Sequence, residues 1–241
     1  MPNWVYNTLT IHESQKHLIL NSNGNVDFNI IEPMPEEMRD FEPAFGNEEQ
    51  VLYYLTDRMQ DTNVNRITDL INEKYTGILT SELAAIYETD PKQAPLMNKA
   101  DVASLIRKTQ DYTRKMSEDR LNEMYESGEK RCRFYVQYGA THWYPWSLAH
   151  WGCKWNAGDT SVETDSDGTM TINFTTPWGA PDAWIKKLAS YKIDFHLYWL
   201  EEQGYQGEFN YDSASDTFDV IDLEPESYND EDEDEDDNNE E

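Results

Sequence analysis

Apolar and polar residues alternate in four stretches of the chain, which is the period of a half-buried strand. These stretches are residues 4–11, 162–174, 193–199 and 209–220. The second contains the turn 165–168, and the fourth a polar turn of its own, so each of these two is expected to be a hairpin. The pattern therefore predicts strands near both ends of the chain.

The segment after the first strand predicts a β-α-β opening. Residues 14–21 are expected to form a short helix, and Asn23-Gly24 is a turn signal. A second strand is expected at 26–31, before two prolines end it. A further helix is expected at 181–190.

Residues 45–128 have the helical period, which predicts a mainly helical region. Asn47 and Gln50 have the spacing of a capping box. The longest helix is expected to begin near residue 98, to break near Ser117 and to end at Gly128. The expected core stripes are Val51, Leu55 and Met59; Val64, Ile67 and Ile71; and Leu83, Ile86 and Tyr87.

After Gly128 the alternation returns and predicts one more strand, with Cys132, Phe134, Val136 and Tyr138 on one face. The order of elements predicts an α+β fold with a split β-α-β antiparallel sheet and helices on one face. The expected organisation is a first part of this domain at 1–35, a helical insertion at 36–129, a second part at 130–221 and a tail at 222–241.

The net charge is strongly negative, with 19 Lys and Arg against 48 Asp and Glu, a balance of -29. Residues 222–241 hold 13 acids and no base, so residues 1–221 carry -16. This charge argues against a general double-stranded nucleic-acid binder and against a protein of anionic membrane surfaces. No apolar run approaches the ~20 residues of a membrane-spanning helix.

Eight consecutive acids in the tail are the expected partner-binding residues. They are Asp230, Glu231, Asp232, Glu233, Asp234, Glu235, Asp236 and Asp237. We expect disorder from about residue 225, because such a block repels itself and buries no apolar surface. When extended, it places carboxylates about 3.3 Å apart, close to the ~3.4 Å phosphate rise of one nucleic-acid strand.

The two cysteines and the amino-terminal residues favour a cytoplasmic protein of the host cell. Two cysteines in 241 residues do not make a disulfide framework, which fits a reducing compartment. The first residues show no basic segment followed by an apolar stretch, so no secretory signal is expected. No cofactor is expected.

Several tryptophan-containing stretches resemble the YubB-type ferredoxin-like family of largely uncharacterised phage, prophage and plasmid proteins. The resemblance rests on residues 1–10, Trp143-Tyr144-Pro145-Trp146, 151–157, 174–178 with Pro181, and 198–204. It implies a ferredoxin-like fold, with the helical middle as an insertion, and an origin in a mobile element. It implies no established activity and no catalytic residues.

Residues 142–155 form the most unusual stretch, and two interpretations stay open. The candidate ligand or interface residues are Trp143, Trp146, His150, Trp151, Lys154 and Trp155. Either the indole rings fill the core and their N–H groups find acceptors, or they form a stacking surface on which Lys154 contacts a phosphate or carboxylate. Arg131 and Arg133, on the strand expected there, would widen that basic spot.

A zinc site is a weaker alternative for the same region. Cys132, His142, His150 and Cys153 supply two sulfur and two nitrogen ligands. Their spacing matches no common zinc pattern, and the resembling family has Thr where Cys153 stands. We therefore expect no metal and two buried thiols.

These observations lead to the hypothesis of a non-enzymatic accessory protein whose acidic surface and tail bind a host protein with a basic nucleic-acid-binding surface, inhibiting a host defence system. One rival is a small-ligand or nucleotide-processing enzyme with His142 or His150 as general base and Lys154 as anion contact. Another is a single-strand nucleic-acid binder that stacks bases on Trp143, Trp146 and Trp155.

Overall fold

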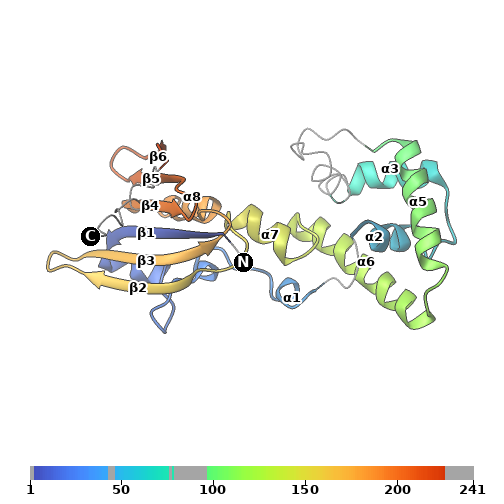
Figure 1. Ribbon diagram of the computed structural model, residues 1–241, viewed down its shortest axis with the longest axis horizontal. Coiled ribbons are helices and arrows are strands. Elements are labelled where there is room, and N and C mark those ends of the chain that lie inside the picture. The colour runs from blue at the N-terminus through green and yellow to red at the C-terminus, as the bar shows by residue number, and fades with distance from the viewer. Residues whose placement is uncertain (1–2, 43–46, 76–77, 79–96, 226–241) are drawn as a thin grey trace, which may run out of the picture. The chain divides into compact units, whose positions relative to one another are not determined.

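The computed structural model describes residues 3–42, 47–75, 78 and 97–225 of the chain. The chain divides into two compact units (Figure 1). Unit 1 comprises Met1–Pro33 and Ser147–Glu241, and unit 2 comprises Met34–Trp146. The boundary between them falls inside helix α7 (Trp143–His150). Within the described ranges, no helix has both the length and the apolar character needed to cross a bilayer.

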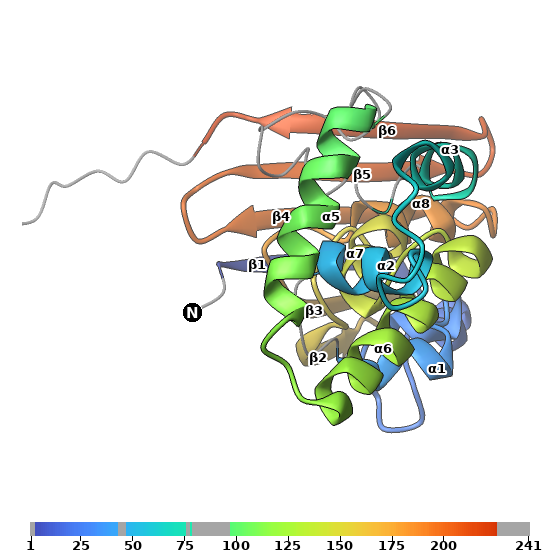
Figure 2. The ribbon, with the colours of Figure 1, turned by 90° about the vertical axis from the view of Figure 1, so that its right-hand side faces the viewer.

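Unit 1 contains a six-stranded antiparallel sheet with the order β2-β3-β1-β4-β5-β6, which can be followed in Figure 2. Its strands are β1 (Trp4–His12), β2 (Gly158–Thr164), β3 (Thr169–Pro177), β4 (Phe195–Glu201), β5 (Gln206–Asp212) and β6 (Thr217–Leu223). The strand predicted at 4–11 and the two predicted hairpins are confirmed, and the strand predicted at 193–199 is β4.

The connections in this sheet form the predicted split β-α-β arrangement. Strand β3 lies between β1 and β2, and β1 lies between β3 and β4. Helix α8 (Asp182–Ala189) joins β3 to β4, as the prediction for 181–190 required. Strands β5 and β6 extend the sheet beyond the four strands of this motif.

Alternating burial on the strands builds the core of unit 1. On β1 the side chains of Val5, Leu9 and Ile11 are buried, and their neighbours lie toward the opposite face. Phe28 stands in the middle of the core, with its ring 4.8 Å from that of Trp184 on α8.

The strand predicted at 26–31 is wrong. Residues Phe28–Ile30 form the short 3-10 helix η2, and the helix expected at 14–21 is the 3-10 helix η1 (Glu13–Leu18). The backbone N–H groups of Val26 and Phe28 donate to side-chain oxygens of Thr160 and Asn156, at 3.0 and 2.9 Å. These side chains take the donors that a sheet partner would otherwise satisfy.

The regular elements in the described residues of unit 2 are all helices. Its helices are α1 (Glu36–Arg39), α2 (Asn47–Leu55), α3 (Val64–Lys74), α5 (Lys99–Thr113), α6 (Glu118–Tyr138) and the first half of α7. The core contains Val51, Leu52, Leu55, Ile67, Ile71, Ile78, Met97, Val102, Ile106 and Cys132. Two of the predicted stripes thus contribute to it, whereas the stripe of Leu83, Ile86 and Tyr87 lies outside the described residues.

The strand predicted over Cys132, Phe134, Val136 and Tyr138 is wrong, because α6 continues through all four residues. The predicted break at Ser117 is confirmed, since its hydroxyl accepts from the Arg120 N–H and caps α6. The helix ends at Gly139, in the left-handed conformation at φ +74°, rather than at Gly128.

The predicted stripe of Val51, Leu55 and Met59 extends one turn beyond its helix. Helix α2 ends at Leu55, and Asp57, Arg58 and Met59 all have positive φ. Met59 nevertheless packs against the unit 2 core, so it keeps its expected burial without being helical.

Candidate functional site

The tryptophan-rich segment is divided between the two units. Trp143 and Trp146 belong to unit 2, and His150, Trp151, Lys154 and Trp155 belong to unit 1. Trp143 donates from Nε1 to the Glu42 carboxylate at 3.0 Å, within unit 2. The segment therefore contributes two separate sets of side chains, one to each unit.

Trp146 and Trp151 are both buried, as the packing interpretation expected. The Nε1–H of Trp151 donates to the backbone carbonyl of Glu32 at 2.9 Å, and its ring lies 5.8 Å from that of Phe28. A buried indole with a satisfied N–H is an ordinary core residue.

Trp155 and Trp178 are exposed and lie on either side of a lysine. Their side chains are 38% and 49% exposed. The Nζ of Lys154 lies 4.8 Å from the Trp155 ring centroid and 4.2 Å from that of Trp178, both within cation–π range. We call Lys154, Trp155 and Trp178 the Trp–Lys cluster.

The backbone holds the Trp–Lys cluster in place. Trp178 has a φ of +68°, which is strained for a residue with a side chain, and its N–H donates to the Asn3 carbonyl at 2.8 Å. The Lys154 carbonyl accepts from the Ser147 hydroxyl at 2.6 Å. Sequence reasoning did not single out Trp178 as a site residue, although its place after the strand-ending Pro177 and before Gly179 was an available signal.

His150 takes part in a charged cluster around Glu32. The two carboxylate oxygens of Glu32 contact His150 Nδ1 at 2.7 Å and Lys187 Nζ at 3.0 Å. Burial alone would raise the pKa of Glu32, but the hydrogen bonds from Lys187 and His150 outweigh it and hold that pKa below its ordinary value. The carboxylate therefore stays ionised and ties α8 to the end of α7.

The four candidate zinc ligands are not one set. Cys132 and His142 belong to unit 2, and His150 and Cys153 belong to unit 1. In the described part of the chain, no group of three or more His, Cys, Asp or Glu side chains could hold a metal ion. Both thiols are buried, and burial raises the pKa of Cys153 and that of Cys132, the latter to about 12.

Arg131 and Arg133 lie on α6, not on a strand, and both have partners inside unit 2. Arg131 is 1% exposed and donates from Nε to the side-chain oxygen of Gln50 at 2.6 Å. Arg133 pairs with Glu37 at 2.6 Å. Burial, together with the charge of Arg131, lowers the pKa of His142 to about 4, so this imidazole is neutral at physiological pH.

A pocket of about 520 Å³ opens at one end of the sheet in unit 1. Its polar lining includes His12 of β1, His196 of β4 and Lys192 and Asp194 of the loop after α8. None of the residues predicted as site residues lines it. The enzyme hypothesis had required a pocket around the tryptophan-rich segment, and this pocket does not supply one.

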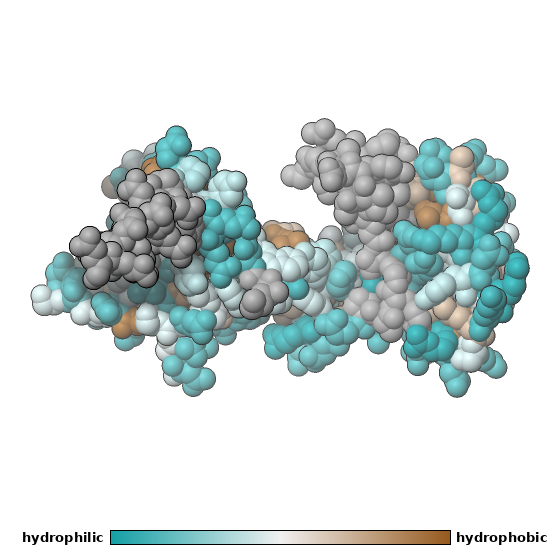
Figure 3. All heavy atoms as spheres, viewed as in Figure 1, coloured by the Kyte–Doolittle hydropathy of each residue, from teal (hydrophilic) through white to brown (hydrophobic). Residues whose placement is uncertain are grey.

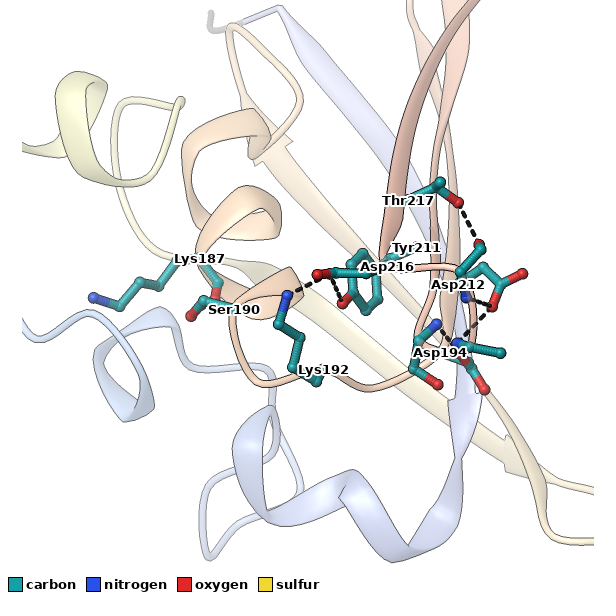
Figure 4. Close-up of polar contacts among 11 residues, drawn as sticks. Lys187, Ser190, Lys192, Asp194, Tyr211, Asp212, Asp216 and Thr217 are labelled. Atoms are coloured by element: carbon teal, nitrogen blue, oxygen red, sulfur yellow. Dashed lines mark hydrogen bonds and ion pairs between the residues drawn. The ribbon is translucent and has the colours of Figure 1, made fainter.

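The charged groups of this pocket are engaged in turn-building contacts (Figure 4). The Lys192 ammonium pairs with Asp216, which also accepts from the Tyr211 hydroxyl at 2.6 Å. Asp194 accepts from the Ser213 backbone N–H at 2.6 Å, and this bond lowers the pKa of Asp194. These contacts hold the loop after α8 against the turn between β5 and β6, so they have a structural role.

Negative charge is concentrated in one part of unit 1. Its described residues carry 17 Asp and Glu against five lysines, and all eight arginines of the chain belong to unit 2. Residues 193–225, which form β4, β5 and β6, hold nine carboxylates and no Lys or Arg. Figure 3 shows hydrophilic side chains over most of the visible described surface of unit 1. The acidic tail residues Asp230–Asp237 lie outside the described residues.

The fold and the connections together define unit 1 as an α+β domain of ferredoxin-like type. Residues 150–240 match the family model described as the ferredoxin-like domain in Api92-like protein. The chain also matches the crystal structure of a protein api92 from Yersinia pseudotuberculosis, with 12% identity, a TM-score of 0.39, and coverage of 95% of this chain and 100% of that one. A search of curated proteins finds no match. The ferredoxin-like part of the expectation from sequence is thereby confirmed.

Proposed function

We propose that this is a non-enzymatic accessory protein of a phage or other mobile element that binds a basic nucleic-acid-binding host protein through its acidic surface. The segregation of charge in unit 1 carries the proposal, because residues 193–225, which contain three neighbouring strands and their turns, hold nine carboxylates and no Lys or Arg. The resemblance to the YubB-type family supports the mobile-element origin, and a host defence protein in the cytoplasm is the natural target.

Three lysines of unit 1 are balanced by carboxylates, one of which is Asp216 of the acidic segment 193–225. Lys186, Lys187 and Lys192, three of the five lysines in unit 1, each contact a carboxylate. Their charge is balanced locally, whereas the carboxylates of β5 and β6 outnumber the cations near them. A surface of one sign attracts a partner of the opposite sign, speeds association and makes it sensitive to salt.

The test is affinity capture from nuclease-treated host lysate, with proteins eluted across a salt gradient and identified by mass spectrometry. Full-length protein is compared with a shortened chain ending at Pro225, which lacks 11 carboxylates. The proposal expects a basic nucleic-acid-binding protein that elutes at lower salt from the shortened chain. An unrelated acidic protein of equal charge serves as the control bait. The proposal is contradicted if the full-length protein retains no basic nucleic-acid-binding protein that this control bait does not also retain.

The Trp–Lys cluster favours a second candidate function, the binding of a nucleotide. Two partly exposed indole rings could stack on a base, and the Lys154 ammonium beside them suits a phosphate. Titration of tryptophan fluorescence with adenosine monophosphate and with adenosine tests this candidate. This candidate function predicts that the monophosphate binds. The substitutions Lys154→Gln and Trp178→Phe should weaken that binding, whereas the control Trp199→Phe should not. No response to the monophosphate at low salt removes it.

A further inference from the structure

Strand β6 is an open edge of the sheet. Within the described residues it pairs with β5 only, in an unbroken register over all seven of its residues. The opposite edge, β2, is irregular, because its register shifts between Gly158 and Ser161. A bulge is a common protection of an edge against further pairing, and β6 has none.

The side chains of β6 also leave this edge open. Val220 and Ile221 are 56% and 40% exposed, and the strand contains no Lys and no Pro; the charges at this edge are the carboxylates of Asp219 and Asp222, which repel an acidic strand but not a basic one. A regular strand with exposed β-branched residues presents unpaired backbone groups together with apolar surface. Both favour the addition of another strand.

The order of residues along β6 defines what such a strand must contain. Asp219 and Ile221 point to one face of the sheet, and Val220 and Asp222 to the other, so at these four central positions each face carries one carboxylate and one apolar side chain. A strand laid beside β6 satisfies all four positions when it reads cation, apolar, apolar, cation. This order is the same in both directions of the added strand.

A second copy of β6 does not satisfy these four positions, because in the antiparallel register that pairs 219–222 with itself Asp219 would face Asp222. Like charges opposite each other on neighbouring strands are destabilising. The nine carboxylates of residues 193–225 add to that repulsion, and they attract a basic segment for the same reason. Charge therefore selects a cationic occupant over a second copy of the chain.

We propose that β6 is a docking edge on which an extended segment of the partner, with the order cation-apolar-apolar-cation, adds as a seventh strand. This inference rests on the proposed function, and it names the surface and the kind of segment that the surface recognises. Backbone hydrogen bonds hold the added strand, and the two Asp side chains select its cations.

Labelled hexapeptides test the proposal by fluorescence anisotropy with the full chain at low salt. The probe is acetyl-Thr-Lys-Val-Val-Lys-Thr-amide. One control has the permuted order Val-Lys-Lys-Val at its centre, and another carries N-methyl groups on alternate amides. We expect the probe to bind about tenfold more tightly than either control, because each cross-strand pair adds a small increment.

Matched variants locate the binding on the protein. Val220→Lys is expected to weaken probe binding at least about tenfold, through both the lost apolar contact and the added charge. Val162→Lys on β2 adds the same charge at an exposed valine of the other edge, 38% exposed, and is expected to have little effect.

Several outcomes would overturn the docking edge. Equal binding of the probe and the permuted peptide, or equal effects of the two lysine variants, would show diffuse attraction only. A dimer in sedimentation that Val220→Lys dissociates would assign the edge to self-association. Partner capture without probe binding overturns the edge alone, and probe binding without capture of any basic protein overturns the proposed function alone.

Discussion

Gly128 of α6 lies directly against the backbone of Gln50 in α2, so closely that a Cβ at position 128 would stand 2.1 Å from the Gln50 carbonyl oxygen. The side-chain oxygen of Gln50 in turn accepts from the Ser127 hydroxyl at 2.8 Å and from Arg131. One face of α6 is thereby fixed on α2 by a close backbone contact and a buried polar network.

Replacing Gly128 with alanine is expected to destabilise unit 2 by about 2–4 kcal/mol, because the methyl group would have to push two helix backbones apart. Urea unfolding followed by far-ultraviolet circular dichroism measures the loss. Glu129→Ala, at the next and exposed position of α6, is the control and should change stability by less than about 0.5 kcal/mol. Equal stability of both variants would contradict the packing described.

The neutral imidazole of His142 predicts a loss of stability in acid. Its pKa is about 4 in the folded chain against an ordinary value of 6.5. As the pH falls from 6.5 toward 4, the unfolded chain takes up a proton that the folded chain does not. The free energy of unfolding therefore falls, by up to about 3 kcal/mol.

Urea unfolding of wild type and His142→Gln at several pH values isolates this effect from the titration of carboxylates. The difference between the two proteins should be constant at pH values well above 6.5 and should shift in favour of the variant as the pH falls toward 4. A difference that does not change with pH would show that His142 titrates normally.

Glu32→Gln is expected to lower the stability of unit 1 by about 1–2 kcal/mol at neutral pH, because the ionised carboxylate contacts both His150 and Lys187. The pKa of Glu32 is depressed, so this stabilisation is present above its ordinary pKa of 4.5 and lost below it. Thermal unfolding at neutral pH measures the effect, with the exposed Glu163→Gln as the control. Unchanged unfolding of the Glu32 variant would refute the role given to this carboxylate.

The Trp–Lys cluster predicts charge-selective quenching of tryptophan emission. Trp155 and Trp178 are exposed beside the Lys154 ammonium, which attracts iodide to their rings. Lys154→Gln should reduce quenching by iodide while leaving quenching by neutral acrylamide unchanged. Equal loss for both quenchers would mean that the substitution had altered ring exposure instead of local charge.

The sheet of unit 1 was predictable because its strands are half buried. Alternation along β1, β3 and β4 follows the two faces of the sheet. Residues 26–31 have the composition of a strand but form only an isolated bridge at Val26, because side chains of Thr160 and Asn156 take the backbone donors of Val26 and Phe28. Contacts with residues so far along the chain cannot be detected in the local sequence pattern.

The end of α6 was misjudged because glycine serves two different purposes in this helix. Gly128 serves close helix packing, whereas Gly139 ends the helix. The alternation after Gly128 is also incidental, since Val136 is 66% exposed and Arg131, on the supposed polar face, is buried. A helical reading of the same residues would have required knowing that a buried arginine finds a partner in Gln50.

For the candidate site, the sequence predicted the types of residue present but not which of them are exposed or lie together. The sequence indicated unusual aromatic residues and a local lysine. However, Trp151 is buried while Trp155 is exposed, and the exposed partner Trp178 directly follows β3. Which of the rings are exposed to solvent depends on which distant segments of the chain pack together, and the local sequence does not show this.

The most direct test of the account is the dissociation constant of the captured basic partner, measured against salt concentration for the full chain and for the chain ending at Pro225. Binding through carboxylates predicts a Kd that rises steeply with salt, a shallower slope and weaker binding without the tail, and displacement of an oligonucleotide from the partner. A Kd indifferent to salt and to the tail, with oligonucleotide and protein bound together, would contradict it.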